Sequence, residues 1–222
     1  MEVAAQARVP AYRPGLGRAE ARALSQALGS GWIGTGIYTR LFEARFAAFV
    51  GGARCAATNS GTAALHLALE AAGARGGEVV TSPLTNVATS HAILHAGAVP
   101  VFCDVGPEHG TLDPEGAAAA LTPRTRAIIA VHLHGHPCDM DPLLDIARRR
   151  RIPVIEDCCQ CVAGAYKGRS LGTLGAAGCF SFGRFKTPTT VDGGAVVYRA
   201  AAWERRLGRL RRLGPEADGP GF

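Results

Sequence analysis

The stretch from residue 127 to residue 157, AIIAVHLHGHPCDMDPLLDIARRRRIPVIED, changes pattern twice along its length. Its two ends, residues 127–133 and 154–156, are short apolar runs that predict buried strands. Between them, residues 140–150 have the length and apolar spacing of a helix. Strands that alternate with helices are typical of a parallel sheet covered by helices. The stretch therefore predicts an α/β fold.

The same alternation extends through most of the 222 residues. Asp192-Gly193-Gly194 is a turn signal between the last two predicted strands. We expect three layers, with a mostly parallel sheet between two layers of helices. One large domain would cover residues 1–213, and residues 214–222 would form a turn-rich tail. Further strands are predicted at residues 78–82, 99–103, 179–182 and 195–198, and further helices at residues 18–28, 41–49, 62–72, 88–96 and 114–121.

Composition is that of an ordinary soluble protein, with 47% hydrophobic and 19% charged residues. No apolar run is long enough to cross a bilayer, and residues 1–14 lack the apolar core of a signal peptide. The seven cysteines form no spaced disulfide framework, so we expect reduced thiols. We therefore expect a cytoplasmic protein without a membrane partner.

The net charge of +6 is spread along the chain, with its densest arginine runs at residues 148–151 and 205–212. The first run ends a predicted helix, where cations are favourable. The second alternates with leucines at helical spacing, which indicates an amphipathic helix. No aromatic residues interleave with this charge, so the pattern does not predict a nucleic-acid partner. A basic surface would suit an anionic substrate.

Small and hydroxyl residues open the predicted helix at residues 62–72, in the segment Asn59-Ser60-Gly61-Thr62-Ala63. Free backbone N–H groups and the helix dipole at such a terminus favour an anion such as phosphate. The alternative is an ordinary N-cap, in which Ser60 or Thr62 bonds to the first helical turn.

Two carboxylates, Glu156 and Asp157, follow an apolar strand. Ligands of open α/β sheets bind at the carboxyl ends of strands. A carboxylate there can hold a pyridine nitrogen protonated. An N-cap aspartate is the alternative interpretation.

Lysine is rare in this chain, because 22 of the 24 basic residues are arginine and only Lys167 and Lys186 are lysine. Arginine cannot replace an amine that must lose a proton and attack a carbonyl. Lys186 lies in a loop beyond a predicted strand, which makes it a candidate Schiff-base lysine. The alternative is a solvated surface lysine.

Three further motifs favour ordinary structural roles. GSGWIG at residues 29–34 fits a dinucleotide-binding pattern but follows a helix rather than a strand. The C-x-x-C motif at residues 158–161 lies deep in a long α/β chain, which favours packing thiols over a redox site. His132, His134 and His136 could line one strand face as metal ligands, but no further ligand follows at a usual spacing, so no metal is predicted.

Several motifs occur in a fixed order along nearly the whole chain. They are SGWIGTG at residues 30–36, NSGTAAL at 59–65, AGAVPVF at 96–102, LTPRT at 121–125, IED at 155–157 and YKGR at 166–169, followed by Lys186. In this order and wording the chain resembles the DegT/DnrJ/EryC1/StrS family of sugar aminotransferases, which use pyridoxal phosphate (PLP).

The resemblance implies the large domain of a fold-type-I PLP enzyme and a role for each matching residue. Lys186 would be the Schiff-base lysine and proton shuttle, and Asp157 would pair with the pyridinium nitrogen. Gln160 matches the family's residue beside the ring, and Asn86 stands where an aromatic residue commonly stacks on it. Lys167 falls in a turn and would be structural. The phosphate would be bound by Gly61, Thr62, Ala63 and Ser181.

The resemblance also implies a reaction, in which an amino acid, expected to be glutamate, gives its amino group to a nucleotide-linked keto-deoxysugar. Family members act as homodimers. A PLP-dependent sugar dehydratase is an alternative on the same scaffold, although that branch replaces the lysine with histidine. Family members continue into a small C-terminal domain that this chain lacks. A truncated, non-catalytic protein or a split subunit is therefore a further alternative.

Overall fold

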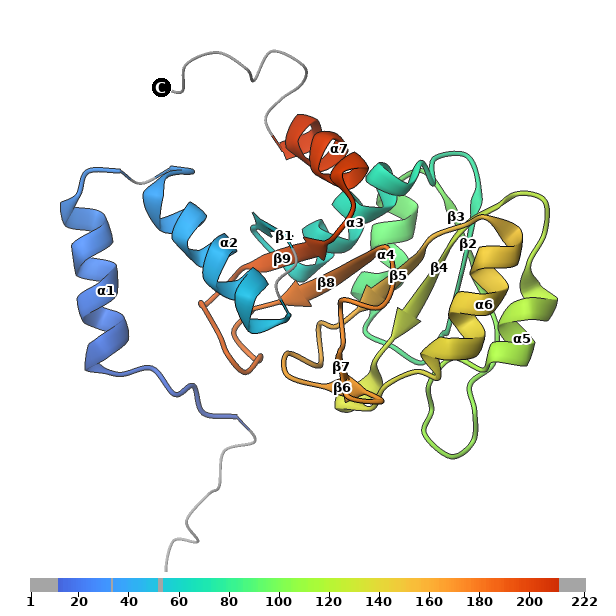
Figure 1. The fold of residues 1–222 in the computed structure, drawn as a ribbon. Coiled ribbons are helices and arrows are strands. Elements are labelled where there is room, and N and C mark those ends of the chain that lie inside the picture. The colour runs from blue at the N-terminus through green and yellow to red at the C-terminus, as the bar shows by residue number, and fades with distance from the viewer. Residues whose placement is uncertain (1–11, 33, 52–53, 212–222) are drawn as a thin grey trace, which may run out of the picture.

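The computed structural model describes residues 12–32, 34–51 and 54–211. A seven-stranded sheet, in the order β1-β9-β8-β5-β4-β2-β3, forms its centre (Figure 1). A separate two-stranded hairpin consists of β6 and β7. The helices are α1 (Arg18–Gly29), α2 (Ile37–Phe49), α3 (Gly61–Ala72), α4 (Val87–His95), α5 (Pro114–Ala120), α6 (Met140–Arg150) and α7 (Ala201–Arg211). The strands are β1 (Arg54–Thr58), β2 (Glu78–Thr81), β3 (Val99–Phe102), β4 (Thr125–Val131), β5 (Val154–Asp157), β6 (Ala165–Tyr166), β7 (Arg169–Ser170), β8 (Ala177–Ser181) and β9 (Gly194–Tyr198).

Most neighbouring strands of the sheet are parallel, as predicted. β3, β2, β4, β5 and β8 pair in parallel, whereas β9 runs antiparallel to both β8 and β1. The carboxyl ends of the parallel strands therefore meet at one edge of the sheet, where ligands of such sheets bind.

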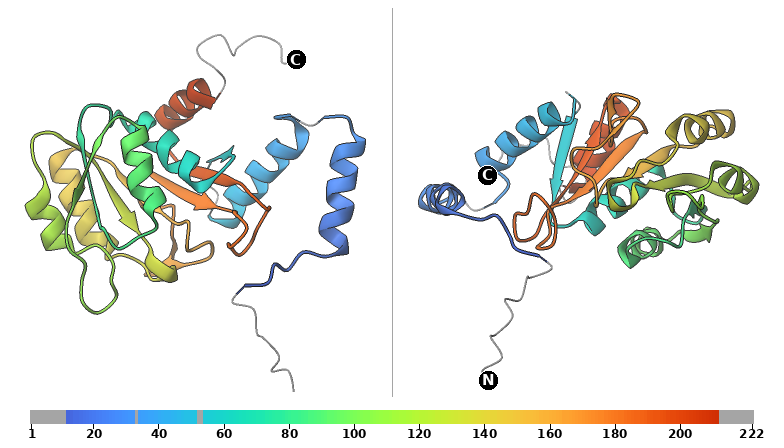
Figure 2. Two further views of the ribbon diagram at one scale, coloured as in Figure 1. Left: turned by 180° about the vertical axis from the view of Figure 1, so that it is seen from behind. Right: turned by 90° about the horizontal axis from the view of Figure 1, so that it is seen from below.

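Two hydrophobic cores lie on the two faces of the sheet. Ile128 and Val154 belong to a core shared with α2, α5 and α6. Their neighbours Ile129 and Ile155 belong to the other core, which is shared with α3, α4 and α7. Successive strand residues point to opposite faces, so continuous apolar runs are buried on both sides. The views in Figure 2 agree with the predicted three layers.

The segment after β4 differs from the prediction of a strand that reaches residue 133. β4 ends at Val131, and Leu133–Gly135 form a short 3-10 turn in which His134 has a φ of 51°. The backbone thus leaves the extended conformation before Leu133. As a consequence, the three neighbouring histidines cannot share one strand face.

The sequence pattern does not predict β1, because Arg54–Thr58 is short, alanine-rich and only partly buried. The strand lies at the edge of the sheet and pairs with β9. The GSGWIG motif begins at Gly29, the last residue of α1, and continues toward α2 rather than following a strand. This agrees with an ordinary structural role, although Ile33 is outside the described residues. The predicted tail at residues 214–222 also lies outside them.

No residue of α1 is buried, and the helix stands away from the sheet in Figures 1 and 2. Within the described ranges, no helix has the length and apolar character needed to cross a bilayer.

The contact between β8 and the loop before it yields a stability prediction. A Cβ on Gly178 would lie 2.3 Å from the Gly172 Cα and 2.4 Å from its carbonyl oxygen, and neither backbone atom can move cheaply. We expect Gly178→Ala to lower the free energy of unfolding by about 2–3 kcal/mol, measured by urea denaturation. A Cβ on Gly208 in α7 would have no atom within 4 Å. Gly208→Ala is the control and should raise stability by up to about 1 kcal/mol. Equal stability of the two variants would contradict this packing.

Candidate functional site

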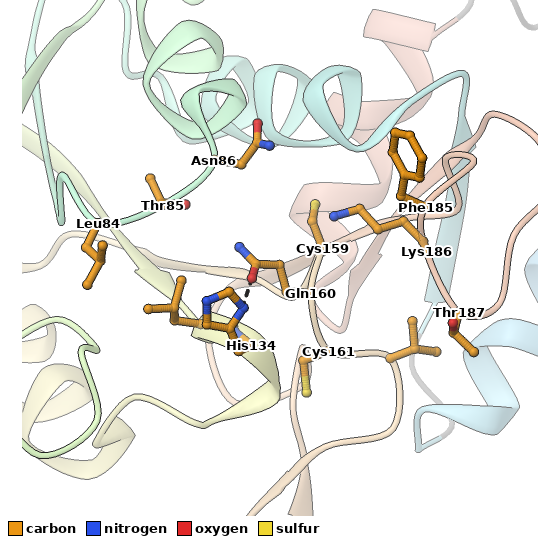
Figure 3. A pocket seen from close by; sticks show the side chains of 12 residues that line it. Leu84, Thr85, Asn86, His134, Cys159, Gln160, Cys161, Phe185, Lys186 and Thr187 are labelled. Carbon is orange, nitrogen blue, oxygen red and sulfur yellow. Dashed lines mark hydrogen bonds between the residues drawn. The ribbon is translucent and has the colours of Figure 1, made fainter. Parts of the chain in front are cut away.

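A cavity of about 640 Å³ lies at the carboxyl edge of the sheet (Figure 3). Its volume is within the usual range for small-molecule sites. Four segments line it: the residues before α4, the turn after β4, the residues after β5 and the loop after β8. The lining residues are Leu84, Thr85, Asn86, Leu133, His134, Cys159, Gln160, Cys161, Val162, Phe185, Lys186 and Thr187.

Lys186 follows β8, and its side chain points into the cavity toward Cys159 (Figure 3). Its backbone is fixed twice. The Lys186 N–H donates to the Gly183 carbonyl at 2.9 Å, and the Tyr12 hydroxyl donates to the Lys186 carbonyl at 3.3 Å. The Tyr12 ring also packs edge-on against Phe185. Tyr12 thus positions the loop, a role that its place 174 residues earlier in the sequence does not reveal.

Lys167 lies in the turn between β6 and β7, away from the cavity lining. Its Nζ is 2.5 Å from the Asp141 carboxylate, which also binds Arg169. This exposed ion-pair network agrees with the predicted structural role of Lys167.

Asp157 is the last residue of β5 and is buried. Its Oδ2 accepts a hydrogen bond from the Thr89 hydroxyl at 2.8 Å, and its Oδ1 accepts from the Cys159 N–H at 3.0 Å. The Thr85 and Thr89 hydroxyl oxygens are 2.9 Å apart. Because the Thr89 proton is given to Asp157, the Thr85 hydroxyl must donate to Thr89. Both threonines orient the carboxylate, and sequence reasoning did not identify either of them.

The N-terminus of α3 meets the ends of β5 and β8. A Cβ on Gly61 would lie 2.7 Å from the Ser181 Cβ and 2.8 Å from the Cys159 Sγ, so only glycine fits there. Ser60 is the N-cap, and its hydroxyl accepts the Ala63 N–H at 3.1 Å. Both interpretations of this segment therefore apply, because Ser60 caps the helix and other N–H groups remain for a phosphate. The Ala63 N–H already donates to the Ser60 hydroxyl. Among the described residues, the N–H groups of Gly61 and Thr62 have no partner.

Asn86 and Gln160 line the cavity, and the side-chain amide oxygen of each accepts a backbone N–H. Asn86 is the N-cap of α4, and its Oδ1 accepts the Ala88 N–H at 3.0 Å. The Gln160 Oε1 accepts the His134 N–H at 3.1 Å (Figure 3). In both side chains the NH₂ group remains as a donor for a ligand.

The cysteines after β5 do not form a redox pair. Cys158 and Cys161 are buried free thiols, and Cys159 lies between α3 and β8. Burial raises the pKa of the Cys158 and Cys159 thiols well above their usual values. A protonated thiol is a poor nucleophile, so the geometry favours the packing role.

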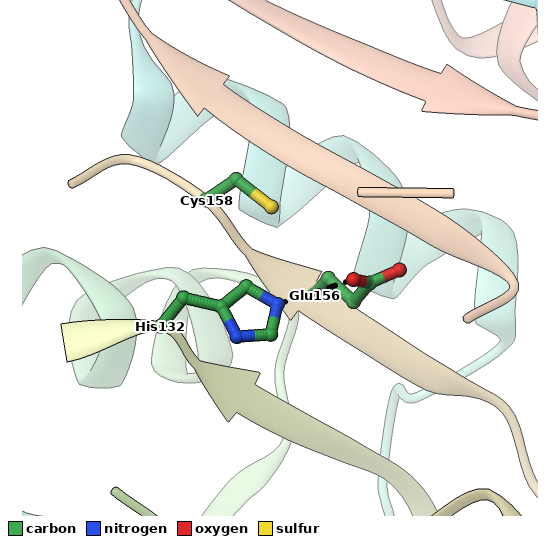
Figure 4. Close-up of side chains that lie close together, drawn as sticks. All are labelled: His132, Glu156 and Cys158. Atoms are coloured by element: carbon green, nitrogen blue, oxygen red, sulfur yellow. Dashed lines mark hydrogen bonds and ion pairs between the residues drawn. The ribbon is translucent and has the colours of Figure 1, made fainter. Parts of the chain in front are cut away.

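Three side chains near the carboxyl edge resemble a metal site. Possible ligand atoms of His132, Glu156 and Cys158 lie within 4.8 Å of one another (Figure 4). The His132 Nδ1 accepts the Cys138 N–H at 3.1 Å, so it carries no proton. The proton is then on Nε2, which donates to the Glu156 Oε2 at 3.1 Å. A neutral imidazole with both nitrogens engaged has no lone pair to give a metal.

Glu156 is instead a structural acceptor. Besides His132, it accepts the N–H groups of Gly172, Leu174 and Gly175, each at 2.7 Å. Its side chain is completely buried. Four donors satisfy the carboxylate, as a buried charge requires. The network joins β5 to β4 and to the loop that leads into β8.

The cavity and the residues next to it have the groups that PLP requires. Lys186 lines the cavity and provides a primary amine. Asp157 is not among the lining residues, but it is hydrogen-bonded to the lining residue Cys159 and provides an oriented carboxylate. Gly61 and Thr62 provide free N–H groups at a helix N-terminus, which favours phosphate. The Ser181 hydroxyl lies beside Gly61. The residues present therefore fit this cofactor.

The Glu156 network can be tested by changing one atom. In Glu156→Gln, an NH₂ group must face either the Gly172 and His132 donors or the Leu174 and Gly175 donors. Two donor–acceptor contacts become donor–donor contacts, so we expect unfolding to become easier by about 2–4 kcal/mol. Glu108 is exposed, and Glu108→Gln should change stability by less than about 0.5 kcal/mol. Urea denaturation measures both, and a Glu156→Gln variant as stable as the control would refute the network.

Comparison with known proteins finds aminotransferases. The model of the DegT/DnrJ/EryC1/StrS aminotransferase family matches residues 14–220. The L-glutamine:2-deoxy-scyllo-inosose aminotransferase of Streptomyces lividus is 44% identical over 94% of this chain and 52% of its own length. GDP-perosamine synthase of Escherichia coli O157:H7 is 40% identical over 85% of this chain and 52% of its own length.

A solved structure is also similar. Spr1654 of Streptococcus pneumoniae, described as a sugar aminotransferase and solved in its PLP form, superposes with a TM-score of 0.86 at 28% identity. The match covers 91% of this chain and 57% of that one. The chain thus spans about half the length of the relatives it matches. The predicted fold class is confirmed, and the chain belongs to the DegT/DnrJ/EryC1/StrS aminotransferase family.

Proposed function

We propose that this chain binds PLP on Lys186 and serves a transamination that produces amino sugars. The observation that carries the proposal is that the Asp157 carboxylate and the Lys186 side chain both lie next to Cys159. The Cys159 N–H holds the Asp157 carboxylate at 3.0 Å, and the Lys186 side chain points toward the same residue (Figure 3). A lysine amine and an oriented carboxylate at one strand-end cavity are the two groups that a PLP site needs.

Lys186 has two tasks in this proposal. Its Nζ would hold the cofactor, and the same amine would move a proton to or from the α-carbon of the amino acid. When bound, PLP supplies an electron sink for the charge that develops at that carbon. The bonds from Gly183 and Tyr12 fix the backbone of Lys186, so motion is confined to its flexible side chain.

Asp157 has an electrostatic task. Its carboxylate would keep the pyridine nitrogen of the cofactor protonated. The Thr89 hydroxyl and the Cys159 N–H fix the orientation of the carboxylate. Positioned groups of this kind need no reorganisation during the reaction.

The start of α3 would hold the phosphate of the cofactor. The free N–H groups of Gly61 and Thr62 and the hydroxyls of Thr62 and Ser181 are the proposed donors. The Ala63 N–H would join them only by leaving the Ser60 hydroxyl. The NH₂ groups of Gln160 and Asn86 remain as donors to the ring or the substrate.

Two classes of amino acceptor are supported by relatives. The name of the E. coli relative contains a nucleotide, GDP, and supports the nucleotide-linked keto-deoxysugar expected from the sequence. The name of the S. lividus relative gives 2-deoxy-scyllo-inosose as acceptor, without a nucleotide, and L-glutamine as donor. Glutamine therefore joins glutamate as a candidate donor. The homodimer and the cytoplasmic location stay predictions, as do the alternatives of a split subunit and a non-catalytic protein.

The assignment of Lys186 is tested by PLP absorption. We expect the purified chain to show a visible band when PLP is added, because a lysine Schiff base extends the conjugation of the ring. Lys186→Ala should lose the band, and Lys167→Ala should keep it. Glutamate and glutamine, added separately, should bleach the band if they are donors.

Each outcome decides one part of the proposal. A band that survives in Lys186→Ala would overturn the assignment of the lysine. A folded chain with no band would overturn PLP binding by this chain. A band that neither amino acid bleaches would overturn both candidate donors.

The role of Thr89 is tested by PLP affinity. Thr89→Val removes the hydroxyl that donates to Asp157 and leaves the shape nearly unchanged. A hydrogen bond to a charged group contributes about 1.5–3 kcal/mol, so we expect PLP to bind at least about tenfold more weakly. Thr85→Val keeps the bond between Thr89 and Asp157 and should have a smaller effect. Fluorescence titration measures both dissociation constants, and a larger loss in Thr85→Val would contradict this order of contacts.

A further inference from the structure

We propose that α3 and α4 carry a surface site for a divalent transition-metal ion, formed by His66, His91, His95 and Glu70. Three imidazoles and a carboxylate are ligands that suit Zn²⁺, and the imidazoles also suit Ni²⁺ and Cu²⁺. None of these residues has a task in the proposed PLP chemistry. The site does not depend on the proposed function.

Two of the histidines share one face of α4. His91 and His95 are four residues apart in this helix, and both are exposed. Residues at this spacing are neighbours on a helix surface. The same spacing places the two zinc-binding histidines of an H-E-x-x-H motif on one helix face. The ring centroids of His91 and His95 are 6.4 Å apart.

The neighbouring helix supplies the other two groups. The ring of His66 in α3 lies 6.0 Å from that of His95, centroid to centroid. Glu70 is one turn further along α3, and its Oε1 is 3.6 Å from the His66 Nε2. His95 therefore lies between His91 of its own helix and the His66–Glu70 pair of α3.

The ring separations are somewhat wider than those around one tetrahedral metal ion. At a Zn–N distance of about 2.0–2.1 Å and a tetrahedral angle at the metal, two bound imidazoles have centroids roughly 5 Å apart. The observed separations are 6.0 and 6.4 Å, and no three possible ligand atoms of this site, whose residues are all described, lie within 4.8 Å of one another. The rings therefore need to move about 1 Å closer and turn their nitrogens toward a common point. The exposed His91 and His95 side chains are free to change rotamer, so this reorientation is cheap.

One cation competes with the metal. Arg75 donates to the Glu70 Oε1 at 2.8 Å. That pair is exposed on the arginine side, and such pairs contribute little to stability. The Glu70 Oε2 remains available, so Glu70 can bind both Arg75 and a metal ion.

The other histidines lack this arrangement. Both nitrogens of His132 are engaged, as described above. The rings of His109 and His136 are tilted by 34°, and their centroids are 3.7 Å apart. This separation is shorter than the roughly 5 Å between two imidazoles on one tetrahedral ion. His109 and His136 therefore provide a control pair of similar chemistry.

The test is calorimetric titration of the untagged chain with ZnCl₂ at pH 7.5. We expect one ion per chain. Loss of a residue that only orients a metal ligand already costs about 10–100-fold in affinity, so loss of a ligand should cost at least as much. His91→Asn/His95→Asn should show this loss, and His66→Asn should show it too. His109→Asn/His136→Asn should bind Zn²⁺ like the parent chain.

Cobalt(II) distinguishes the site from thiol binding, which the seven cysteines could provide. We expect visible Co²⁺ bands without the near-ultraviolet charge-transfer absorption of a thiolate. No binding, a thiolate signature, or undiminished affinity in His91→Asn/His95→Asn would each overturn the proposal. Circular dichroism identifies any variant that fails to fold, and His91→Gln with His95→Gln then replaces it. PLP absorption of these variants should match the parent chain, so failure of this site is separable from failure of the PLP site.

Discussion

The buried carboxylate of Glu156 is the contact on which the rest of the site depends. It accepts four hydrogen bonds. One comes from the Nε2–H of His132 after β4, and three come from backbone N–H groups of the loop before β8. One side chain thereby fixes three adjacent segments around β5. Residues that follow β4 and β5 line the cavity, so the network fixes the backbone next to two of its walls. A buried charge with fewer partners would be costly, so the loop at residues 172–175 has little freedom.

The two adjacent carboxylates of β5 have different tasks because successive strand residues face opposite sides of the sheet. Glu156 points toward the loop before β8 and serves the structure. Asp157 points toward α4, where the Thr89 hydroxyl donates a hydrogen bond to it, and it is the carboxylate that we propose for the pyridine nitrogen. The same alternation divides Cys158, which packs in one core, from Cys159, which lines the cavity. The side on which Asp157 and Cys159 lie therefore follows from the alternation of side chains along β5, and the buried Glu156 holds that strand in place.

Much of this could be predicted from the sequence, because chemistry restricts residue type. The scarcity of lysine makes Lys186 a candidate, and an apolar strand that ends in carboxylates makes Asp157 another. The contacts that orient them could not be predicted. Thr89 lies 68 residues before Asp157, and Tyr12 lies 174 residues before Lys186. β1 carries too little apolar pattern to be recognised without its partner β9. The turn at Leu133–Gly135 depends on a positive φ at His134, for which a histidine gives no clear signal.

The central claim is that PLP binds to one lysine of this chain, Lys186, at the edge that Glu156 organises. The most direct measurement is borohydride reduction of the chain with PLP, followed by proteolysis and mass spectrometry. Reduction makes the lysine–cofactor bond permanent, so the modified residue can be read from its peptide. The account predicts a single phosphopyridoxyl group on Lys186. A label on Lys167, or no label on a folded chain, would contradict it.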